Sequence, residues 1–294
     1  MAYLHSDREQ FRDAIDLAYE QTGVMVQAIE KDYYVTMLLR LLAQRMPYIV
    51  FKGGTSLSKC HKVIRRFSED IDITIDTLLS QGQKKKIKQA IVESAEKLGM
   101  TIENLDETRS RRDYNRYVIT YDSVIPMASD ALKAAVLLET SYTAVSFPTV
   151  LLPVHSYIGD MMEQEAPDVI EEYNLNPFEM KVQGIDRTLA DKVFAVCDYY
   201  LQGKVAKHSR HLYDIYKLLP LVPQDENFKE LVKEVRAVRE QSVICPSALP
   251  EADVPELLEK IIKEKAYKQD YDSLTTQLLE ETVPYDTVIA TLKK

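Results

Sequence analysis

The chain has 294 residues, of which 46% are hydrophobic and 28% are charged, and its formal net charge is −9. This length allows a large hydrophobic core, in one large domain or two smaller ones, and the composition is ordinary for a globular protein. A dedicated nucleic-acid binder is usually basic. The acidic balance therefore argues against tight non-specific binding to nucleic acid, without excluding an RNA acceptor at a local basic surface.

The apolar runs of the sequence are too short for a membrane span, which needs ~18 residues. The charged residues within 7–12 are unlike a secretory signal. Cys60, Cys197 and Cys245 are far apart, with neither the spacing of metal ligands nor that of a disulfide framework. We therefore expect a cytoplasmic protein with no membrane partner.

Two helices are predicted before residue 44. Apolar residues recur at helical spacing over 6–22, where Ser6 or Asp7 would cap the helix, and again over 24–43. The second helix contains the polar trio 30–32, Glu-Lys-Asp. This trio is either a surface turn of the helix or a contribution to a site.

A short strand and a glycine turn follow. The apolar residues 48–51 predict a buried strand, and Gly53-Gly54 forces a tight turn into a helix. Glycines let the backbone approach a ligand closely, and the amides and hydroxyls of Thr55 and Ser56 at a helix N-terminus suit a phosphate. The segment is a candidate nucleotide-binding loop, although a Gly-Gly turn alone is more often only a turn.

The next predicted strand alternates acidic and apolar residues over 70–75. Residues two apart share a face of a strand, so Asp70 and Asp72 point the same way while the isoleucines fill the core. Two carboxylates on one face repel each other unless a cation lies between them, and Mg²⁺ takes such ligands together with substrate phosphates.

Alone, this acidic pattern is more often a solvated edge. Joined to the strand, glycine turn and helix before it, the pattern is typical of enzymes that transfer a nucleotidyl group from a nucleoside triphosphate. The spacings of a Walker loop and of a dinucleotide-binding fingerprint are both missing from the sequence.

A lysine-rich amphipathic helix is predicted over 81–99, followed by three strands. The strands are expected at 101–104, 116–121 and 133–142, and Glu139 is set in the apolar run of the last one. Three basic runs, at 84–88, 109–116 and 204–210, are candidate RNA-binding surfaces, although a charge run more often only solvates a surface.

The prolines of residues 144–180 indicate loops and short elements of secondary structure, with a helix at 159–165 and a strand at 180–182. Helical spacing then returns, first from Thr188 and again over 208–219. From spacing alone, Lys192 would be a surface lysine with its stem along the helix. Asp214 would form a surface pair with Arg210, four residues earlier.

We therefore predict an α/β (α+β) protein of two lobes. Residues 1–180 would form a catalytic domain with a small mixed sheet flanked by helices. Residues 181–294 would form a mostly helical domain that contributes to the site.

The segments 52–59 and 66–72 together resemble the AbiEii/AbiGii-type nucleotidyltransferase toxin family, of the DNA-polymerase-β-like nucleotidyltransferase superfamily. Further blocks in the same order extend the resemblance over roughly residues 28–220. These blocks are Glu-Lys-Asp-Tyr-Tyr-Val at 30–35, Leu-Ala-Asp-Lys-Val-Phe at 189–194 and Arg-His-Leu-Tyr-Asp-Ile-Tyr at 210–216.

The resemblance implies roles for particular residues. Asp70 and Asp72 would hold one or two Mg²⁺ ions, Lys192 would neutralise substrate phosphates, and Asp214 would orient this set. By analogy with the wider superfamily, Glu139 is a candidate third carboxylate, and a simple pair with a lysine on an edge strand is an equally good interpretation. The nucleotide-binding candidates are Lys52, Gly53, Gly54, Thr55, Ser56 and Lys59.

The resemblance also implies a biological role. The chain would be a Mg²⁺-dependent toxin of a toxin–antitoxin or phage-defence pair, transferring a nucleoside monophosphate from a triphosphate to RNA at tRNA 3′ ends. An antitoxin encoded nearby would oppose it.

Two other interpretations stay open. The acceptor could be a protein hydroxyl, or the chain could be a non-catalytic module that binds a nucleotide or a partner. The chemically demanding side chains Ser56, Asp70, Asp72, Lys192 and Asp214 are all present, which argues against the module.

Overall fold

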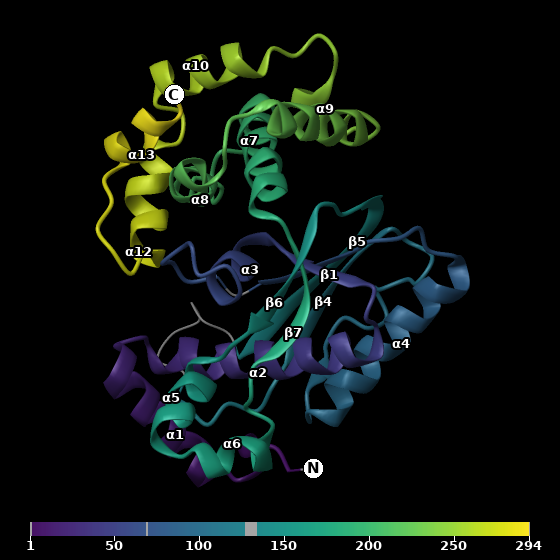
Figure 1. Ribbon diagram of the computed structural model, residues 1–294, viewed down its shortest axis with the longest axis vertical. Helices are drawn as coiled ribbons and strands as arrows, with labels where there is room; N and C mark the ends of the chain where they lie inside the picture. The colour runs from purple at the N-terminus through teal and green to yellow at the C-terminus, as the bar shows by residue number, and fades with distance from the viewer. Residues whose placement is uncertain (1, 69, 127–133, 294) are drawn as a thin grey trace. The chain divides into compact units, whose positions relative to one another are not determined.

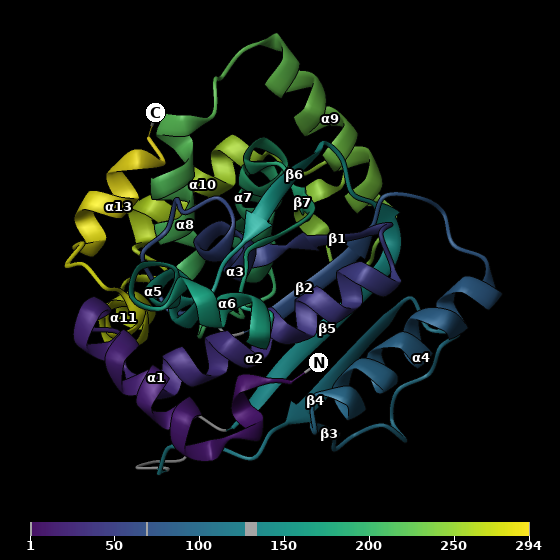
Figure 2. The same cartoon turned by 60° about the horizontal axis from the view of Figure 1, so that its bottom comes forward.

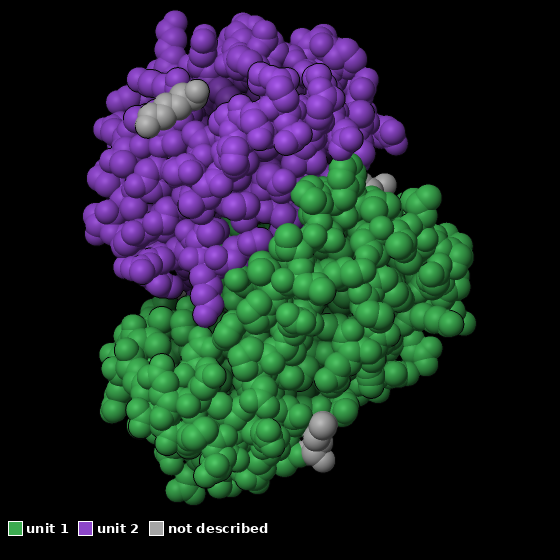
Figure 3. All heavy atoms as spheres, viewed as in Figure 1, with its two compact units in different colours: residues 1–60, 69–182 green, residues 61–68, 183–294 purple. Residues whose placement is uncertain are grey.

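The computed structural model describes residues 2–68, 70–126 and 134–293 (Figure 1). The chain forms two compact units, one of residues 1–60 and 69–182 and the other of residues 61–68 and 183–294 (Figure 3). The connector 61–68 therefore belongs to the second unit, although it lies in sequence between two segments of the first. That the two predicted lobes act as a catalytic domain and a helical domain stays a prediction.

The first unit contains a seven-stranded mixed sheet in the order β3-β4-β5-β2-β1-β7-β6. Strand β2 is antiparallel to β1 and parallel to β5, and β4 is antiparallel to β5. The predicted mixed sheet is thus confirmed. The strands are β1 (Ile49–Lys52), β2 (Asp70–Ile75), β3 (Thr101–Ile102), β4 (Tyr114–Thr120), β5 (Ala135–Val145), β6 (Thr149–Val154) and β7 (Phe178–Gln183).

Helices α1 and α4 of this unit begin where the sequence supplies a capping side chain. The Asp7 carboxylate accepts hydrogen bonds from two backbone amides of the first turn of α1, and Ser80 forms a capping box with Gln83 at α4. The helices are α1 (Arg8–Thr22), α2 (Val26–Arg45), α3 (Gly53–Lys59), α4 (Gln81–Lys97), α5 (Tyr157–Glu165) and α6 (Pro167–Tyr173).

Helices α2 and α4 cover one face of the sheet, as Figure 2 shows. The isoleucines Ile71, Ile73 and Ile75 of β2 are buried in the same hydrophobic cluster as the apolar side chains of these helices. Because side chains alternate along a strand, this burial directs Asp70 and Asp72 to the opposite face.

The structure differs from the expectation of loops in residues 144–180. Strand β6 lies at the edge of the sheet, where Pro153 is tolerated because one side of an edge strand needs no ladder hydrogen bond. Helix α6 begins at Pro167, a position where the missing amide costs nothing. Lys133, the predicted start of the strand before β6, lies outside the described residues.

The second unit is helical. Its connector runs alongside the C-terminal segment, because the amide of Phe67 donates to the carbonyl of Leu278 at 2.8 Å and that of Glu280 to the carbonyl of Arg65 at 3.1 Å. None of the described helices is long and apolar enough to cross a membrane. The helices are α7 (Ile185–Leu201), α8 (Arg210–Leu218), α9 (Glu226–Glu240), α10 (Val254–Glu264), α11 (Lys268–Asp270), α12 (Thr276–Leu278) and α13 (Tyr285–Thr291).

Candidate active site

A row of charged side chains crosses four strands of the first unit. The strand registers pair Lys52 with Asp72, Asp72 with Glu139, and Glu139 with Arg116. Residues that are paired across neighbouring strands project from the same face of a sheet. Lys52, Asp72, Glu139 and Arg116 therefore form a line in which two acidic side chains lie between two basic ones, called here the charged row.

Asp70 lies on the same face, two residues before Asp72 on β2 and in register with Leu137 of β5. Both aspartates are half-buried. The structure thus places the two predicted metal ligands side by side on one face of the sheet, as the alternation in the sequence indicates.

Glu139 combines features of both interpretations given for it. It is the cross-strand neighbour of Asp72, where a third carboxylate would be expected, and its side chain is 32% exposed. Its Oε1 atom also lies 3.7 Å from Nε of Arg116, so it has a cationic partner on the next strand. The partner is an arginine and not the lysine that was considered.

The glycine turn touches the acidic strand directly. Gly53 has φ +81°, a left-handed backbone conformation that side chains other than glycine rarely adopt. A Cβ atom on Gly53 would lie 1.9 Å from Oδ2 of Asp72 and 2.9 Å from its Cγ. Only glycine leaves room for the Asp72 carboxylate at this position.

One of two hydroxyl groups beside the glycine turn also bonds to the acidic strand. Thr55 donates its hydroxyl to the backbone carbonyl of Asp70 at 2.6 Å, and Ser56 donates to the carbonyl of Gly53 at 2.9 Å. Ser56 is fully buried. In this structure the Thr55 hydroxyl holds the turn against β2 and the Ser56 hydroxyl bonds within the turn, and their predicted contact with a phosphate stays a prediction.

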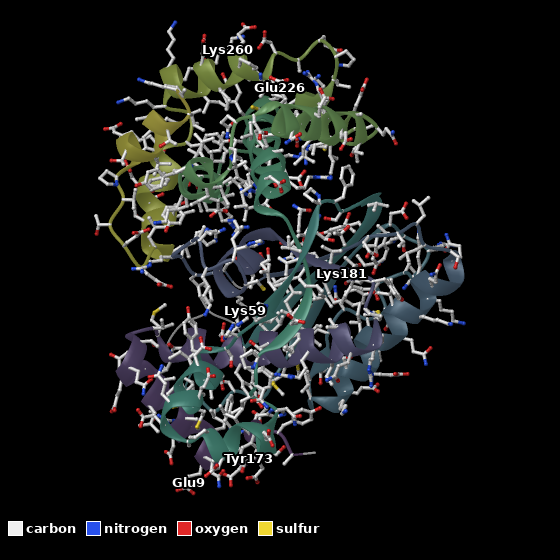
Figure 4. The ribbon with its side chains drawn as sticks, in the orientation of Figure 1. Glu9, Lys59, Tyr173, Lys181, Glu226 and Lys260 are labelled. Atoms are coloured by element: carbon white, nitrogen blue, oxygen red, sulfur yellow. The ribbon has the colours of Figure 1, made fainter. Side chains whose placement is uncertain are left out.

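Lys59, labelled in Figure 4, forms an ion pair with Asp32 of α2, and both side chains are largely buried. Asp32 also accepts a hydrogen bond from the amide of Tyr157 at 3.1 Å. Glu30 is buried and accepts from the amide of Val124 at 2.7 Å. The polar trio is therefore no surface turn, because it fixes the end of α3 and a neighbouring loop.

A second group of predicted residues lies in the second unit. Asp214 is completely buried, and its two carboxylate oxygens accept from Nε and an Nη of Arg66 at 2.7 and 2.8 Å. Nζ of Lys192 lies 2.6 Å from Oδ2 of the same carboxylate. Two buried cations thus share one buried anion, called here the Arg66–Lys192–Asp214 cluster.

The charges of this cluster shift the titration of its members. Burial alone would raise the pKa of Asp214, but the nearby Arg66 and Lys192 hold that pKa well below its usual range. Burial lowers the pKa of Lys192, and the contact with Asp214 opposes that change. The carboxylate is therefore ionised at any physiological pH.

Both expectations drawn from spacing alone are wrong here. Lys192 and Asp214 are buried, because their helices α7 and α8 turn these residues toward each other inside the second unit. Sequence reasoning also gave no role to Arg66. It stands in a block that carried the family resemblance, but 148 residues separate it from Asp214, and no spacing rule pairs residues so far apart.

A comparison with protein families identifies the family of this chain. The family described as nucleotidyl transferase AbiEii toxin, type IV toxin–antitoxin system, matches residues 36–291. The chain belongs to the AbiEii nucleotidyltransferase toxin family. The matched span of this AbiEii protein contains the glycine turn, the acidic strand and the Arg66–Lys192–Asp214 cluster.

Among solved structures, MenT4, a nucleotidyltransferase toxin from Mycobacterium tuberculosis H37Rv, is similar in fold. The match covers 95% of this chain and 87% of MenT4, with a TM-score of 0.52 and 16% sequence identity. At this identity the likeness shows that the AbiEii chain shares the nucleotidyltransferase fold. A sequence search of curated proteins gives no match.

Proposed function

We propose that this toxin transfers a nucleoside monophosphate from a nucleoside triphosphate to the terminal hydroxyl of an RNA, with the tRNA 3′ end as acceptor and pyrophosphate as the leaving group. The observation that carries the proposal is the contact of Gly53 with the Asp72 carboxylate, on the face that also presents Asp70 and Glu139. This contact joins a turn suited to phosphates with two carboxylates suited to a cation.

The acidic residues fit Mg²⁺. Asp70 and Asp72 offer hard oxygen ligands on one face, and Mg²⁺ is usually held by one or two carboxylates together with substrate phosphates. No three acidic, histidine or cysteine side chains converge on a common point within 2–68, 70–126 and 134–293. When bound, the ion would stabilise charge on the phosphates and lower the pKa of the attacking hydroxyl.

The other side chains have complementary tasks in this proposal. Lys52, beside Asp72, neutralises phosphate charge, and the backbone of Gly53-Gly54 lies close enough to a phosphate to bind it. A carboxylate oxygen of Glu139, next to Asp72 on β5, accepts the proton of the acceptor hydroxyl. Lys59, with Asp32, keeps α3 in place behind the turn.

Lys192 and Asp214 keep their implied roles as part of the proposal. Lys192 neutralises substrate phosphates, and Asp214 orients Lys192. The 2.6 Å ion pair inside the second unit supports the orienting role. The antitoxin partner implied by a type IV system is proposed to be a protein encoded beside this toxin, and the pair to act in phage defence.

The experiment that tests the proposal measures transfer from each of four α-³²P-labelled triphosphates to purified tRNA, with Mg²⁺ and with chelator. We expect Mg²⁺-dependent label on tRNA, and the productive triphosphate will give the base preference. In parallel reactions with total cell protein in place of tRNA, label on protein and none on tRNA would identify a protein acceptor. If the toxin neither binds nor transfers triphosphate, the chain is a non-catalytic module.

The Gly53→Ala substitution tests the contact between the turn and the acidic strand. An alanine held in the left-handed backbone conformation of residue 53 should lower the free energy of unfolding by roughly 1–2 kcal/mol. Because the new Cβ displaces the Asp72 carboxylate, transfer should fall by roughly 10²-fold, the scale expected for a small misplacement of a reacting group.

Gly23→Ala is the matched control for this substitution. Gly23 has φ +69°, and a Cβ there would meet nothing within 4 Å. In urea unfolding, the Gly23→Ala variant should lose about as much stability as Gly53→Ala. Its rate of nucleotidyl transfer should stay at the wild-type value. Equal transfer by both alanine variants would show that the Gly53 contact does not position Asp72 for the reaction.

A further inference from the structure

One basic segment of the first unit is held in a defined conformation by hydrogen bonds and an ion pair, which a surface run of charges would not need. Residues 109–116 contain four arginines and one aspartate in a chain whose net charge is −9. The segment ends on β4, and its arginines and Tyr114 are all exposed, Tyr114 by 52%. We call residues 109–116 the arginine–tyrosine strip.

The strip meets the charged row at Arg116, which belongs to both. Tyr114 and Arg116 are two apart on β4, so their side chains share a face, and Tyr114 is in register with Ser141 just as Arg116 is with Glu139. One such step along a strand is about 7 Å. Tyr114 is therefore one step away from the carboxylate proposed to receive the proton of the acceptor.

The electrostatics of Tyr114 agree with this position. Burial first, and then the Glu139 carboxylate, raise the pKa of the Tyr114 phenol to about 12, and Asp72 adds to the effect. The phenol is therefore protonated at neutral pH, so the ring presents a neutral face that a base can stack on.

Three of the four arginines of the strip, Arg109, Arg111 and Arg112, have no anionic partner among the described residues, whereas Arg116 pairs with Glu139. Arg109 and Arg112 donate only to backbone carbonyls, such as those of Thr108 at 3.0 Å and Glu107 at 3.2 Å. In the described parts of the chain, neither they nor Arg111 form an ion pair with a carboxylate. Their charges are therefore available to an outside anion.

The loop that carries these arginines is nevertheless held in shape. The buried Asn115 side chain accepts from the amide of Arg109 at 2.8 Å and donates to its carbonyl at 3.0 Å. Lys88 of α4 donates to the carbonyl of Thr108 at 2.9 Å. Asp113, the acid of the strip, is paired with Lys84 of α4. A run that merely solvated a surface would need no such anchoring.

We propose that the arginine–tyrosine strip binds the single-stranded 3′ end of the RNA acceptor, with Arg109, Arg111 and Arg112 contacting phosphates and Tyr114 stacking on a base. This inference rests on the proposed function. Unpaired arginines beside an exposed aromatic ring are the elements that bind single-stranded nucleic acid without sequence specificity. A protein acceptor would need neither the row of phosphate contacts nor the stacking ring.

The test compares variants of the full-length toxin in two measurements, the binding of a 5′-labelled single-stranded RNA at several salt concentrations and the KM for tRNA. The Arg111→Ala/Arg112→Ala variant should bind the RNA roughly 10–100-fold more weakly. Its salt slope, log Kd against log salt, should be lower by about 1.4 for two lost phosphate contacts.

Tyr114→Ala should weaken binding roughly 10-fold with the salt slope unchanged, because stacking releases no counterions. Tyr114→Phe keeps the ring and should bind like wild type. The control Lys229→Ala/Lys233→Ala removes the same charge from exposed positions of α9 and should change neither measurement. Melting temperatures close to that of wild type will show that each variant is folded.

The outcomes separate the two proposals. If wild type labels tRNA and the strip variants match it in both measurements, the strip only solvates the surface and this inference is overturned alone. If wild type labels protein and not RNA, both this inference and the proposed RNA acceptor are overturned. If the control variant loses as much RNA affinity as the strip variants do, the effect is one of general charge. That result would also overturn the inference.

Discussion

Asp72→Asn is expected to reduce nucleotidyl transfer by roughly 10³-fold, the scale of losing one group that stabilises charge in a transition state. Asparagine has nearly the shape of aspartate and fits beside Gly53, so the glycine turn need not move. What the variant loses is the negative charge between Lys52 and Glu139 in the charged row. The loss should therefore appear in kcat more than in folding.

Thermal unfolding gives a second readout of the same variant. Without Mg²⁺, Asp70 and Asp72 repel each other on one face, so Asp72→Asn should be as stable as wild type or slightly more stable. With saturating Mg²⁺ and triphosphate, wild type should gain about 2.7 kcal/mol at a hundredfold excess over Kd, and the variant should gain far less.

Asp16→Asn is the control. Asp16 is exposed on α1, and its carboxylate lies 3.8 Å from the Arg12 guanidinium, a surface pair that contributes little to stability. It should transfer and unfold like wild type. Transfer by Asp72→Asn at the wild-type rate, measured with the same labelled triphosphate, would show that the acidic strand is not the site of the reaction.

Local patterns in the sequence predict much of this fold. The isoleucines at 71, 73 and 75 give β2 its buried face, and the same alternation places Asp70 and Asp72 together. Asp7, one of the two cap candidates for the first helix, is the residue at which α1 begins, because its side chain satisfies amides that the helix leaves unpaired. These features depend only on residues close together in the chain.

Local sequence patterns do not predict the order of the strands in the sheet. The charged row exists because β2 lies between β1 and β5, with β4 beyond, and its registers join residues that are far apart in sequence. The sequence indicates neither that Arg116 would be the partner of Glu139 nor that the Thr55 hydroxyl would bind the Asp70 carbonyl. Strand β6 was missed for a related reason, since an edge strand tolerates the prolines that argue for a loop.

The second large effect is expected in the stability of the second unit. Asp214→Ala should lower the free energy of unfolding by about 3–5 kcal/mol, the usual cost of removing one partner of a buried ion pair. Arg66 and Lys192 are 2% and 8% exposed, so water reaches neither cation to replace the carboxylate. Urea unfolding followed by circular dichroism measures the loss.

Asp272→Ala is the control for this prediction. Asp272 pairs with Lys268 at 2.7 Å, but both side chains are exposed, at 48% and 40%. Removing a surface pair of this kind should cost about 0.5 kcal/mol or less. Equal losses in the two variants would contradict the view that burial makes the Asp214 carboxylate important.

The two cations of the cluster should respond differently to the loss of Asp214. Lysine can give up its proton when buried, and burial already lowers the pKa of Lys192, so Lys192 can become neutral. Arginine keeps its charge in proteins, so most of the cost should come from Arg66. The double variant Arg66→Met/Asp214→Ala should therefore recover stability relative to Asp214→Ala, whereas Lys192→Met/Asp214→Ala should recover less. A larger recovery with Lys192→Met would mean that Lys192, and not Arg66, is the cation that most needs the carboxylate.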